Sequence, residues 1–146
     1  MPDIHILTET DLRGAIDLSL EVVDRIDDAF RRLAAGGVVL PPILSMAIAE
    51  HHGEVDPAAF ARVRYVPDRL RQTRESGELR AATAAGVVAP AVAFAELGDV
   101  LSGATPGRSA AADVTLADLT GTGVQDTAIA TLTLECTGDA GTSIAT

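Results

Sequence analysis

The chain has 146 residues, a net charge of −10 and a composition that is 47% hydrophobic but only 3% aromatic. This length fits a single domain, whose core must be filled mainly by Ala, Val, Leu and Ile. The acidity argues against nucleic acid, whose binding depends on neutralising phosphates, and the eleven basic residues are all arginine, which excludes a Schiff-base or P-loop lysine.

The N-terminal part of the chain predicts one strand and one long helix. Residues 4–7 alternate enough for a short strand, and Thr8 offers a helix cap with Asp11 as its capping-box partner. Residues 19–35 form the clearest helix, because apolar residues recur on one face at helical spacing. Residues 38–48 are extended, but two prolines restrict them to an edge strand or a bent pair of strands.

The stretch from Glu50 to Asp56 holds two of the three histidines and marks where the two halves of the chain meet. Its side chains are metal ligands by type. The adjacent His51 and His52 would point to opposite sides of a strand, however, and could not both face one ion. A polar active-site loop or a solvent-facing linker is therefore favoured over a metal site.

Beyond this stretch the sequence predicts a series of short elements. They are a helix through Phe60, a strand at 63–66, helices at 67–74, 77–85 and 94–101, a strand at 113–119 and a helix from about 124 to 134. The tail from residue 137 onward is small and polar and is expected to fray.

One basic cluster falls within these helices and consists of Arg69, Arg71, Arg74 and Arg80. A solvated helix face that balances nearby glutamates is favoured over the alternative, an anion-binding site.

The turn at Gly121 and Gly123 follows a predicted strand and opens a predicted helix, as a dinucleotide-binding fingerprint does. Asp126 replaces the third glycine of that fingerprint, and its charge opposes a pyrophosphate at the helix N-terminus. The turn therefore fails as a Rossmann motif. A strand–turn–helix whose free backbone N–H groups face an anionic group remains an alternative.

The compartment is predicted from one cysteine and from hydropathy. Cys136 is alone, so no internal disulfide can form and a reducing cytoplasm is the default. No run of residues approaches the roughly 20 apolar positions that a membrane helix needs.

The words ELGDVLSG, PGR and DLTGTGVQDTA, at residues 96–103, 106–108 and 118–128, are the most specific of the chain. Together with the rest of residues 5–56 and 54–130, they resemble the ornithine cyclodeaminase/mu-crystallin family, most closely its ectoine-utilisation branch. In that family the N- and C-terminal segments build a substrate-binding and dimerisation domain. An NAD-binding Rossmann domain is inserted between them.

The resemblance implies that the inserted domain is absent here and that residues 49–57 are the seam between its flanks. Related sequences carry a similar short motif on both flanks of the inserted domain. A deletion between the two copies of this motif would produce the present sequence. The family's carboxylate-binding arginine falls near Ser45, its catalytic aspartate aligns with Ile48, and its substrate lysine has no counterpart. No catalytic residue is therefore predicted.

The resemblance also implies a small set of binding positions. The predicted substrate-binding residues are Glu54, Thr120 and Gly121. The family's cofactor-contacting lysine aligns with His52, and contacts after the last strand map to Leu119 and Thr120. His52 and Leu119 are therefore the predicted cofactor-binding positions, and no metal is predicted.

We predict an α+β fold, a mixed β-sheet with flanking helices, over a single domain at residues 1–136 with a frayed tail at 137–146. The sheet would combine residues 4–7, 38–47 and 113–119, with 63–66 as a further candidate strand.

The leading functional hypothesis is a family remnant, a homodimer that binds a small amino-acid-like ligand and has no cofactor or NAD chemistry of its own. One alternative is an NAD-dependent deaminase, cyclodeaminase or imine reductase of ectoine or ornithine metabolism, whose cofactor domain another chain supplies. A second is a structural subunit that pairs with a full-length paralogue. No nucleic acid or membrane partner is expected.

Overall fold

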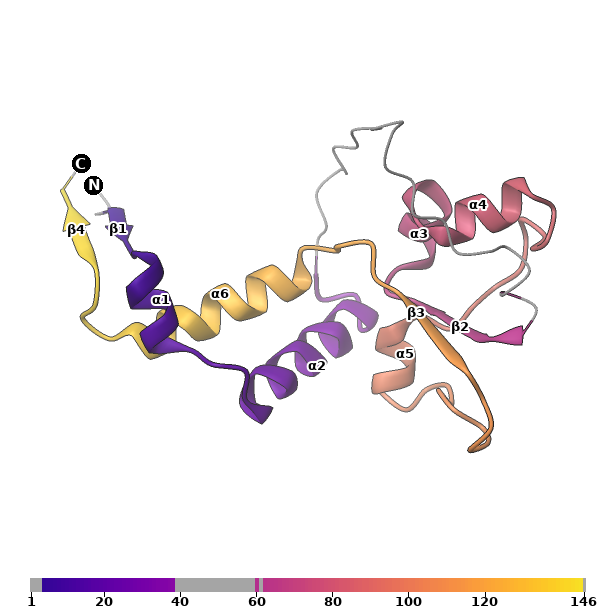
Figure 1. Ribbon diagram of the computed structural model, residues 1–146, viewed down its shortest axis with the longest axis horizontal. Helices are drawn as coiled ribbons and strands as arrows, with labels where there is room; N and C mark the ends of the chain where they lie inside the picture. The colour runs from indigo at the N-terminus through magenta and orange to yellow at the C-terminus, as the bar shows by residue number, and fades with distance from the viewer. Residues whose placement is uncertain (1–3, 39–59, 61, 146) are drawn as a thin grey trace. The chain divides into compact units, whose positions relative to one another are not determined.

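The computed structural model describes residues 4–38, 60 and 62–145. Its elements follow in the order β1 (Ile4–Ile6), α1 (Glu9–Ala15), α2 (Leu20–Ala34), β2 (Arg64–Pro67), α3 (Leu70–Ser76), α4 (Glu78–Ala84), α5 (Leu97–Leu101), β3 (Thr115–Asp118), α6 (Val124–Thr137) and β4 (Thr142–Ile144) (Figure 1). The chain divides into two compact units. Unit 1 comprises Met1–Ala29 and Gly123–Thr146, and unit 2 comprises Phe30–Thr122.

Unit 1 joins the two ends of the chain in a small antiparallel sheet. The register of β1 and β4 is Ile4↔Ile144, His5↔Ser143 and Ile6↔Thr142. The ring of His5 ties this pair together, since its Nε2 lies 2.6 Å from the Ala140 carbonyl oxygen and its Nδ1 lies 3.1 Å from Ser143 Oγ. β4 thus forms within the segment 137–146 for which the sequence predicts fraying, because its backbone finds a partner in β1.

The helices α1, α2 and α6 begin where their sequence signals predict. Thr8 and Asp11 form the predicted capping box of α1, in which the Asp11 carboxylate accepts the Thr8 N–H at 2.8 Å. The long predicted helix is present as α2. α6 follows Gly123, whose φ of 71° favours glycine, and it packs against α1. Arg25 on α2 and Glu135 on α6 form an ion pair at 2.6 Å.

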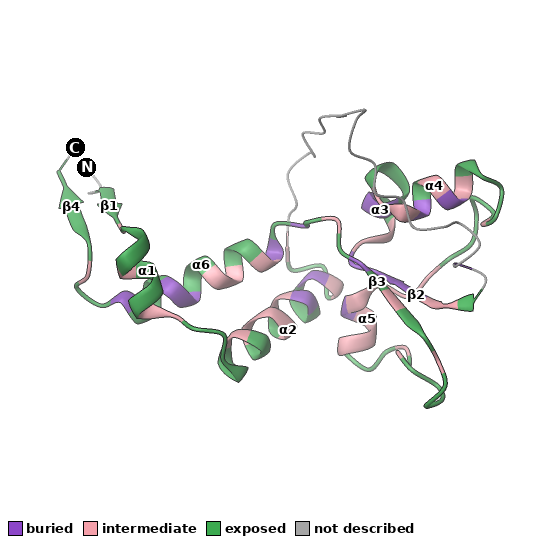
Figure 2. Ribbon diagram, in the orientation of Figure 1, coloured by how far each residue is buried: buried purple, intermediate pink, exposed green. Residues whose placement is uncertain are grey.

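Unit 2 is built on a pair of parallel strands. β2 and β3 pair from Arg64 opposite Thr115 to Pro67 opposite Asp118. Parallel neighbours need a long crossover connection, which α3, α4 and α5 supply here. β2 is largely buried, whereas β3 is mostly exposed until its last residue (Figure 2).

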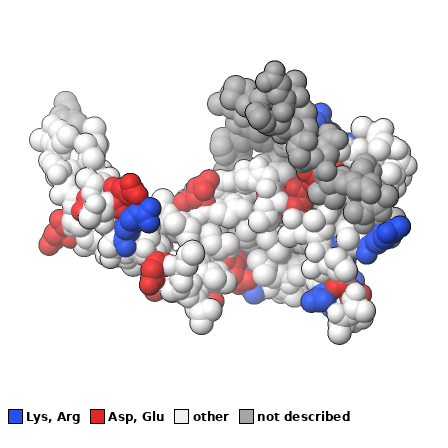
Figure 3. Space-filling view, viewed as in Figure 1, with Lys and Arg blue, Asp and Glu red and all other residues white. Residues whose placement is uncertain are grey.

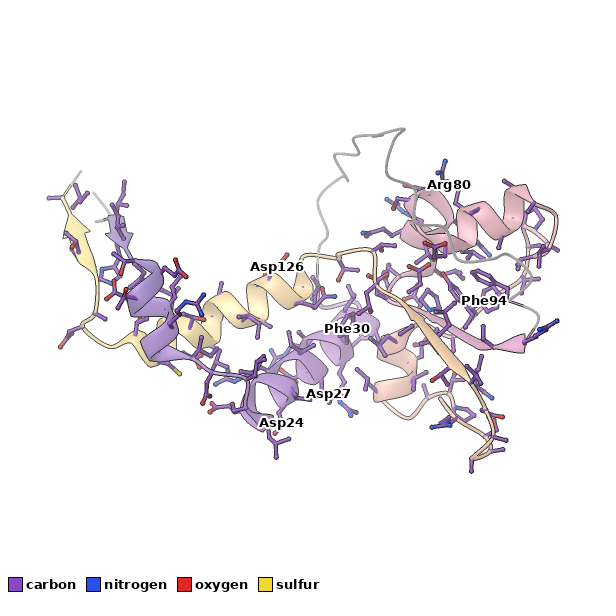
Figure 4. The ribbon with its side chains drawn as sticks, viewed as in Figure 1. Asp24, Asp27, Phe30, Arg80, Phe94 and Asp126 are labelled. Carbon is purple, nitrogen blue, oxygen red and sulfur yellow. The ribbon has the colours of Figure 1, made fainter. Side chains whose placement is uncertain are left out.

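The core of unit 2 gathers three of the four aromatic rings of the chain. Phe60, Tyr65, Leu79 and Ala82 form a buried cluster. The ring centroid of Tyr65 lies 4.8 Å from that of Phe60 and 4.9 Å from that of Phe94, which meets it edge-on. Phe94 is labelled in Figure 4. Concentrating the rings in one place lets a chain poor in aromatic residues bury a large area there.

These elements confirm the predicted α+β class, with small sheets and flanking helices. The described strands do not join one mixed sheet, however, but form two two-stranded sheets, β1–β4 and β2–β3. The reason is that residues 4–6 pair with the C-terminal end, while the crossover brings β3 onto β2. Residues 39–47 lie outside the described part, and the single domain at 1–136 stays a prediction. No described helix is both long and apolar enough to cross a membrane.

Candidate functional site

Polar side chains gather where β2 and β3 end. Because these strands are parallel, their carboxyl ends meet at one edge of the sheet, the edge at which α/β proteins commonly bind ligands. Asp68 follows β2 directly and Asp118 ends β3, and both residues are buried. We call the segment 119–122, which continues from β3, the edge loop.

Asp68 holds the edge loop from the inside and is only 1% exposed. Its Oδ2 accepts the backbone N–H of Thr120 at 2.7 Å, and its Oδ1 accepts the Thr120 hydroxyl at 2.9 Å. The same Oδ1 accepts the N–H of Arg69 at 2.6 Å. Both oxygens of this carboxylate are therefore occupied by donors of its own chain.

Asp118 connects the second strand to the core and to α4. Its Oδ2 accepts the Tyr65 hydroxyl at 2.6 Å and the N–H of Glu78 at 3.0 Å. Gly77, which precedes α4, permits this close approach. A Cβ on Gly77 would lie 2.7 Å from that oxygen and 2.9 Å from Thr73 Cα, so any larger residue would push the carboxylate or the backbone away.

Burial controls the protonation of this edge. The pKa of Asp68 is raised above its usual value, mainly by desolvation and also by the charge of Asp118, while hydrogen bonds from Thr120 and Arg69 oppose the rise. The pKa of Tyr65 is raised by burial and by its hydrogen bond to Asp118. Tyr65 is therefore a neutral hydrogen-bond donor at neutral pH.

Gln72 completes the hold on the edge loop. Its Nε2 donates to the Thr120 carbonyl at 3.2 Å and to the Gly121 carbonyl at 3.1 Å. The N–H, hydroxyl and carbonyl of Thr120 are thereby all engaged within the protein. The accessible part of the loop includes the side chain of Leu119, which is 58% exposed, and Gly121, where an added Cβ would meet open space.

The arginines near this edge make contacts within the chain. Arg69 Nη1 pairs with Glu96 Oε2 at 2.6 Å, and Arg74 donates to the Val92 carbonyl at 2.7 Å. Arg80 projects from α4 (Figure 4). The basic groups that are visible on the face shown in Figure 3 lie in separate patches. These contacts favour the helix-face interpretation of the cluster over an anion site.

The predicted site residues separate into two groups. Leu119, Thr120 and Gly121 lie together in the edge loop, at the carboxyl edge of the strand pair. His52 and Glu54, with the seam at 49–57, lie outside the described residues.

Asp68, Asp118 and Tyr65 were not predicted as site residues, because Asp68 falls within the predicted helix 67–74 and the other two fall within predicted strands. A usable signal existed, since an acid stands at or beside the end of each of two predicted strands, 63–66 and 113–119. If those strands are parallel, the two acids must come close.

The arrangement suits positioning better than proton transfer, because Asp68 and Asp118 accept hydrogen bonds from their own chain. The described residues contain no cluster of three or more His, Cys, Asp and Glu side chains that could hold a metal ion. The start of α6 does not fit the pyrophosphate of a dinucleotide, because Asp126 lies in its first turn.

Unit 1 carries a separate open groove of about 470 Å³. It is lined by Arg13, Ile16, Asp17, Leu18, Val22 and Ile129. Of these, Leu18 is 99% exposed, and Leu20, at the start of α2, is 82% exposed. Exposed apolar groups gathered in this way are typical of surfaces that meet a partner.

Residues 43–140 match the ornithine cyclodeaminase/mu-crystallin family. The chain is 58% identical over 88 residues to an uncharacterized cyclodeaminase of Sinorhizobium fredii, covering 60% of this chain and 27% of that protein. It is 43% identical over 82 residues to the iminosuccinate reductase of Paracoccus denitrificans, covering 56% and 25%.

Among solved structures, an archaeal alanine dehydrogenase dimer with bound NAD matches with a TM-score of 0.57 and 30% identity, over 63% of this chain and 29% of that one. The chain thus spans about a quarter of the length of the curated relatives it matches.

Proposed function

Because the chain belongs to the ornithine cyclodeaminase/mu-crystallin family, we propose that it is a pairing and small-ligand-binding domain without NAD-linked chemistry of its own. The ligand would be a small amino-acid-like molecule, in keeping with the ornithine, iminosuccinate and alanine in the names of the family and of similar proteins. We further propose membership of the ectoine-utilisation branch, supported by the word DLTGTGVQDTA, and a cytoplasmic location, supported by the lone cysteine.

The observation that carries this proposal is the edge loop at the carboxyl ends of β2 and β3. Asp68 and Gln72 bind the polar groups of Thr120, and Gln72 also binds the carbonyl of Gly121. The side chain of Leu119 and the space beside Gly121 stay open. A rigid loop with an accessible glycine lets the backbone approach a ligand closely.

We infer that the chain has no NAD-linked chemistry of its own from the types of residue at the key positions. The chain has no lysine, and Asp126 stands where a dinucleotide fingerprint needs glycine. Ser45 and Ile48 stand at the positions that the resemblance gives to the family's carboxylate-binding arginine and catalytic aspartate.

Pairing is proposed on the apolar surface of unit 1. Leu18, Leu20 and Val23 are 99%, 82% and 60% exposed, and Leu134 on α6 is 59% exposed. Burying such side chains against a second copy would remove apolar area from water at roughly 25 cal/mol per Å².

The alternative is NAD-dependent amino-acid chemistry, with the cofactor domain supplied by another chain. The parallel pair β2–β3 with its helical crossover favours this alternative, because such units build dinucleotide-binding sheets. A structural subunit that pairs with a full-length paralogue is the remaining hypothesis, and it predicts hetero-oligomers on co-purification.

The purified chain tests these hypotheses directly. Light scattering should give a dimer mass, and titration with L-ornithine or L-alanine should shift the backbone amide NMR signals of Leu119 and Gly121. NAD⁺ should shift none of them. Tight NAD⁺ binding by the chain alone would contradict the proposal, while turnover that appears only with a second chain would favour the NAD-dependent alternative.

A further inference from the structure

The edge loop is held from one side. Asp68 fixes the N–H and hydroxyl of Thr120, and Gln72 fixes the carbonyls of Thr120 and Gly121. Leu119 instead exposes its side chain, and the space beside Gly121 is open. The edge loop therefore uses one set of atoms for hydrogen bonds within the protein and exposes another set to solvent.

Asp68 is not placed to meet a ligand itself. It is 1% exposed, and its two carboxylate oxygens accept from Thr120 and from the N–H of Arg69. The contacts of Asp68 can therefore act on a ligand at this edge only through Thr120 or the backbone of Arg69.

We propose that Asp68 is a positioning residue, which sets the orientation of the edge loop by binding the N–H and the hydroxyl of Thr120 at once. The loop then offers the side chain of Leu119 and the open space beside Gly121 to a small amino-acid-like ligand. The identity of that ligand rests on the proposed function, whereas the hold on Thr120 stands on the geometry alone.

A carboxylate is the group that this role requires. Two donors of Thr120 approach different oxygens of Asp68, at 2.7 and 2.9 Å. Backbone N–H groups, which can only donate, reach both oxygens, from Thr120 at Oδ2 and from Arg69 at Oδ1. Asparagine has one acceptor oxygen, so Asp68→Asn would lose at least one of these two bonds and would remove the charge that strengthens the other. Thr120→Ser keeps both donors, and Thr120→Val removes only the hydroxyl.

Asp118 offers a matched control on the neighbouring strand. It is also buried and also accepts from a hydroxyl and a backbone N–H, but its partners are Tyr65 and Glu78. Both donors reach the same oxygen, Oδ2, so Asp118→Asn can keep them on its amide oxygen. The variant removes the charge of the acceptor and should not release Thr120 from Asp68.

Hydrogen exchange of the full chain, followed by NMR, measures this difference residue by residue. In Asp68→Asn the amide of Thr120 should exchange at least about tenfold faster than in the wild type, while the β2–β3 ladder amides keep their relative protection. Thr120→Ser should behave as the wild type, and Thr120→Val should lie between. In Asp118→Asn the Thr120 amide should follow the global change in stability only.

A titration with L-ornithine tests the proposed ligand binding separately from the positioning role of Asp68. If the wild-type signals of Leu119 and Gly121 do not shift, the ligand-binding function fails, yet the exchange of Thr120 still tests the positioning role. If they shift, Asp68→Asn should weaken L-ornithine binding at least about tenfold and Thr120→Ser should not. Equal release of Thr120 in Asp68→Asn and Asp118→Asn would overturn the positioning role.

Discussion

The hydroxyl of Tyr65 donates to Oδ2 of Asp118 at 2.6 Å, and both residues are buried. The bond runs diagonally across the two parallel strands, because Tyr65 stands opposite Leu116 in their register. Tyr65 also packs its ring against Phe60 and Phe94. One side chain thus links the apolar core of unit 2 to the carboxyl edge of the sheet.

Tyr65→Phe should keep the ring contacts and remove this bond. Asp118 then loses its hydroxyl donor while it stays buried, so the free energy of unfolding should fall by about 1.5–3 kcal/mol, the usual range for a bond to a charged group. Urea denaturation measures the change. Tyr65→Leu, which also removes the ring contacts, should lose more, and an unchanged midpoint for Tyr65→Phe would contradict the role of the bond.

Gly77 and Gly14 should respond to alanine in opposite ways. At Gly77 a Cβ would lie 2.7 Å from Asp118 Oδ2 and 2.9 Å from Thr73 Cα, so Gly77→Ala should destabilise by about 1–3 kcal/mol. At Gly14, in α1, a Cβ meets nothing within 4 Å. Gly14→Ala should therefore stabilise by about 0.5–1 kcal/mol through helix propensity.

Thermal melting of the two variants gives the comparison, with the wild type as reference. No loss at Gly77 would contradict the packing around the carboxyl edge, and a loss at Gly14 would contradict the open space beside that glycine.

Local signals predicted the helices well. The period of its apolar residues predicted α2, and Thr8 with Asp11 predicted the start of α1, because caps and helical faces depend on neighbours in sequence. β4 was not predictable in this way. Thr142 and Ser143 are small and polar, and they form a strand only because β1 pairs with them from the other end of the chain.

The same contrast between local and tertiary signals decides which residues of the candidate site could be predicted from the sequence. The edge loop residues Leu119, Thr120 and Gly121 were identified from a family resemblance in contiguous sequence. Asp68 was not, because its role depends on β2 and β3 being parallel and in register, which is a tertiary property. Sequence alone does not state which strands are neighbours.

Leu18 and Leu20 should contribute to pairing of two copies. Both are almost fully exposed in the single chain, at 99% and 82%. If they become buried in a dimer, Leu18→Ser and Leu20→Ser should each weaken association about tenfold or more, since burying a leucine contributes roughly 1.5–3 kcal/mol. Sedimentation across a concentration series measures the dissociation constant.

Val114 supplies the control for this prediction, because it is 62% exposed but belongs to unit 2. Val114→Ser should leave the dimer unchanged. Equal weakening by all three variants would point to a general loss of stability, and no weakening by either leucine variant would contradict pairing through unit 1.

Asp68 and Asp11 should change stability with pH in opposite directions. The pKa of Asp68 is raised in the folded state, chiefly by burial, so its contribution is fully present below the unfolded value of about 3.9 and is lost as pH rises through the folded value. The pKa of Asp11 is lowered, first by the hydrogen bond from the Thr8 backbone N–H. Its contribution is present above the unfolded value and is lost as pH falls through the folded value.

Replacing either acid by asparagine removes the contribution of that carboxyl group to the change of stability with pH. On acidification from about pH 7 to pH 3, Asp68→Asn should lose more stability than the wild type, because it lacks a group that gains from protonation. Asp11→Asn should lose less. Urea midpoints at a series of pH values measure both slopes, and each variant serves as the control for the other. A profile for Asp68→Asn that runs parallel to the wild type would show that burial does not raise the pKa of Asp68.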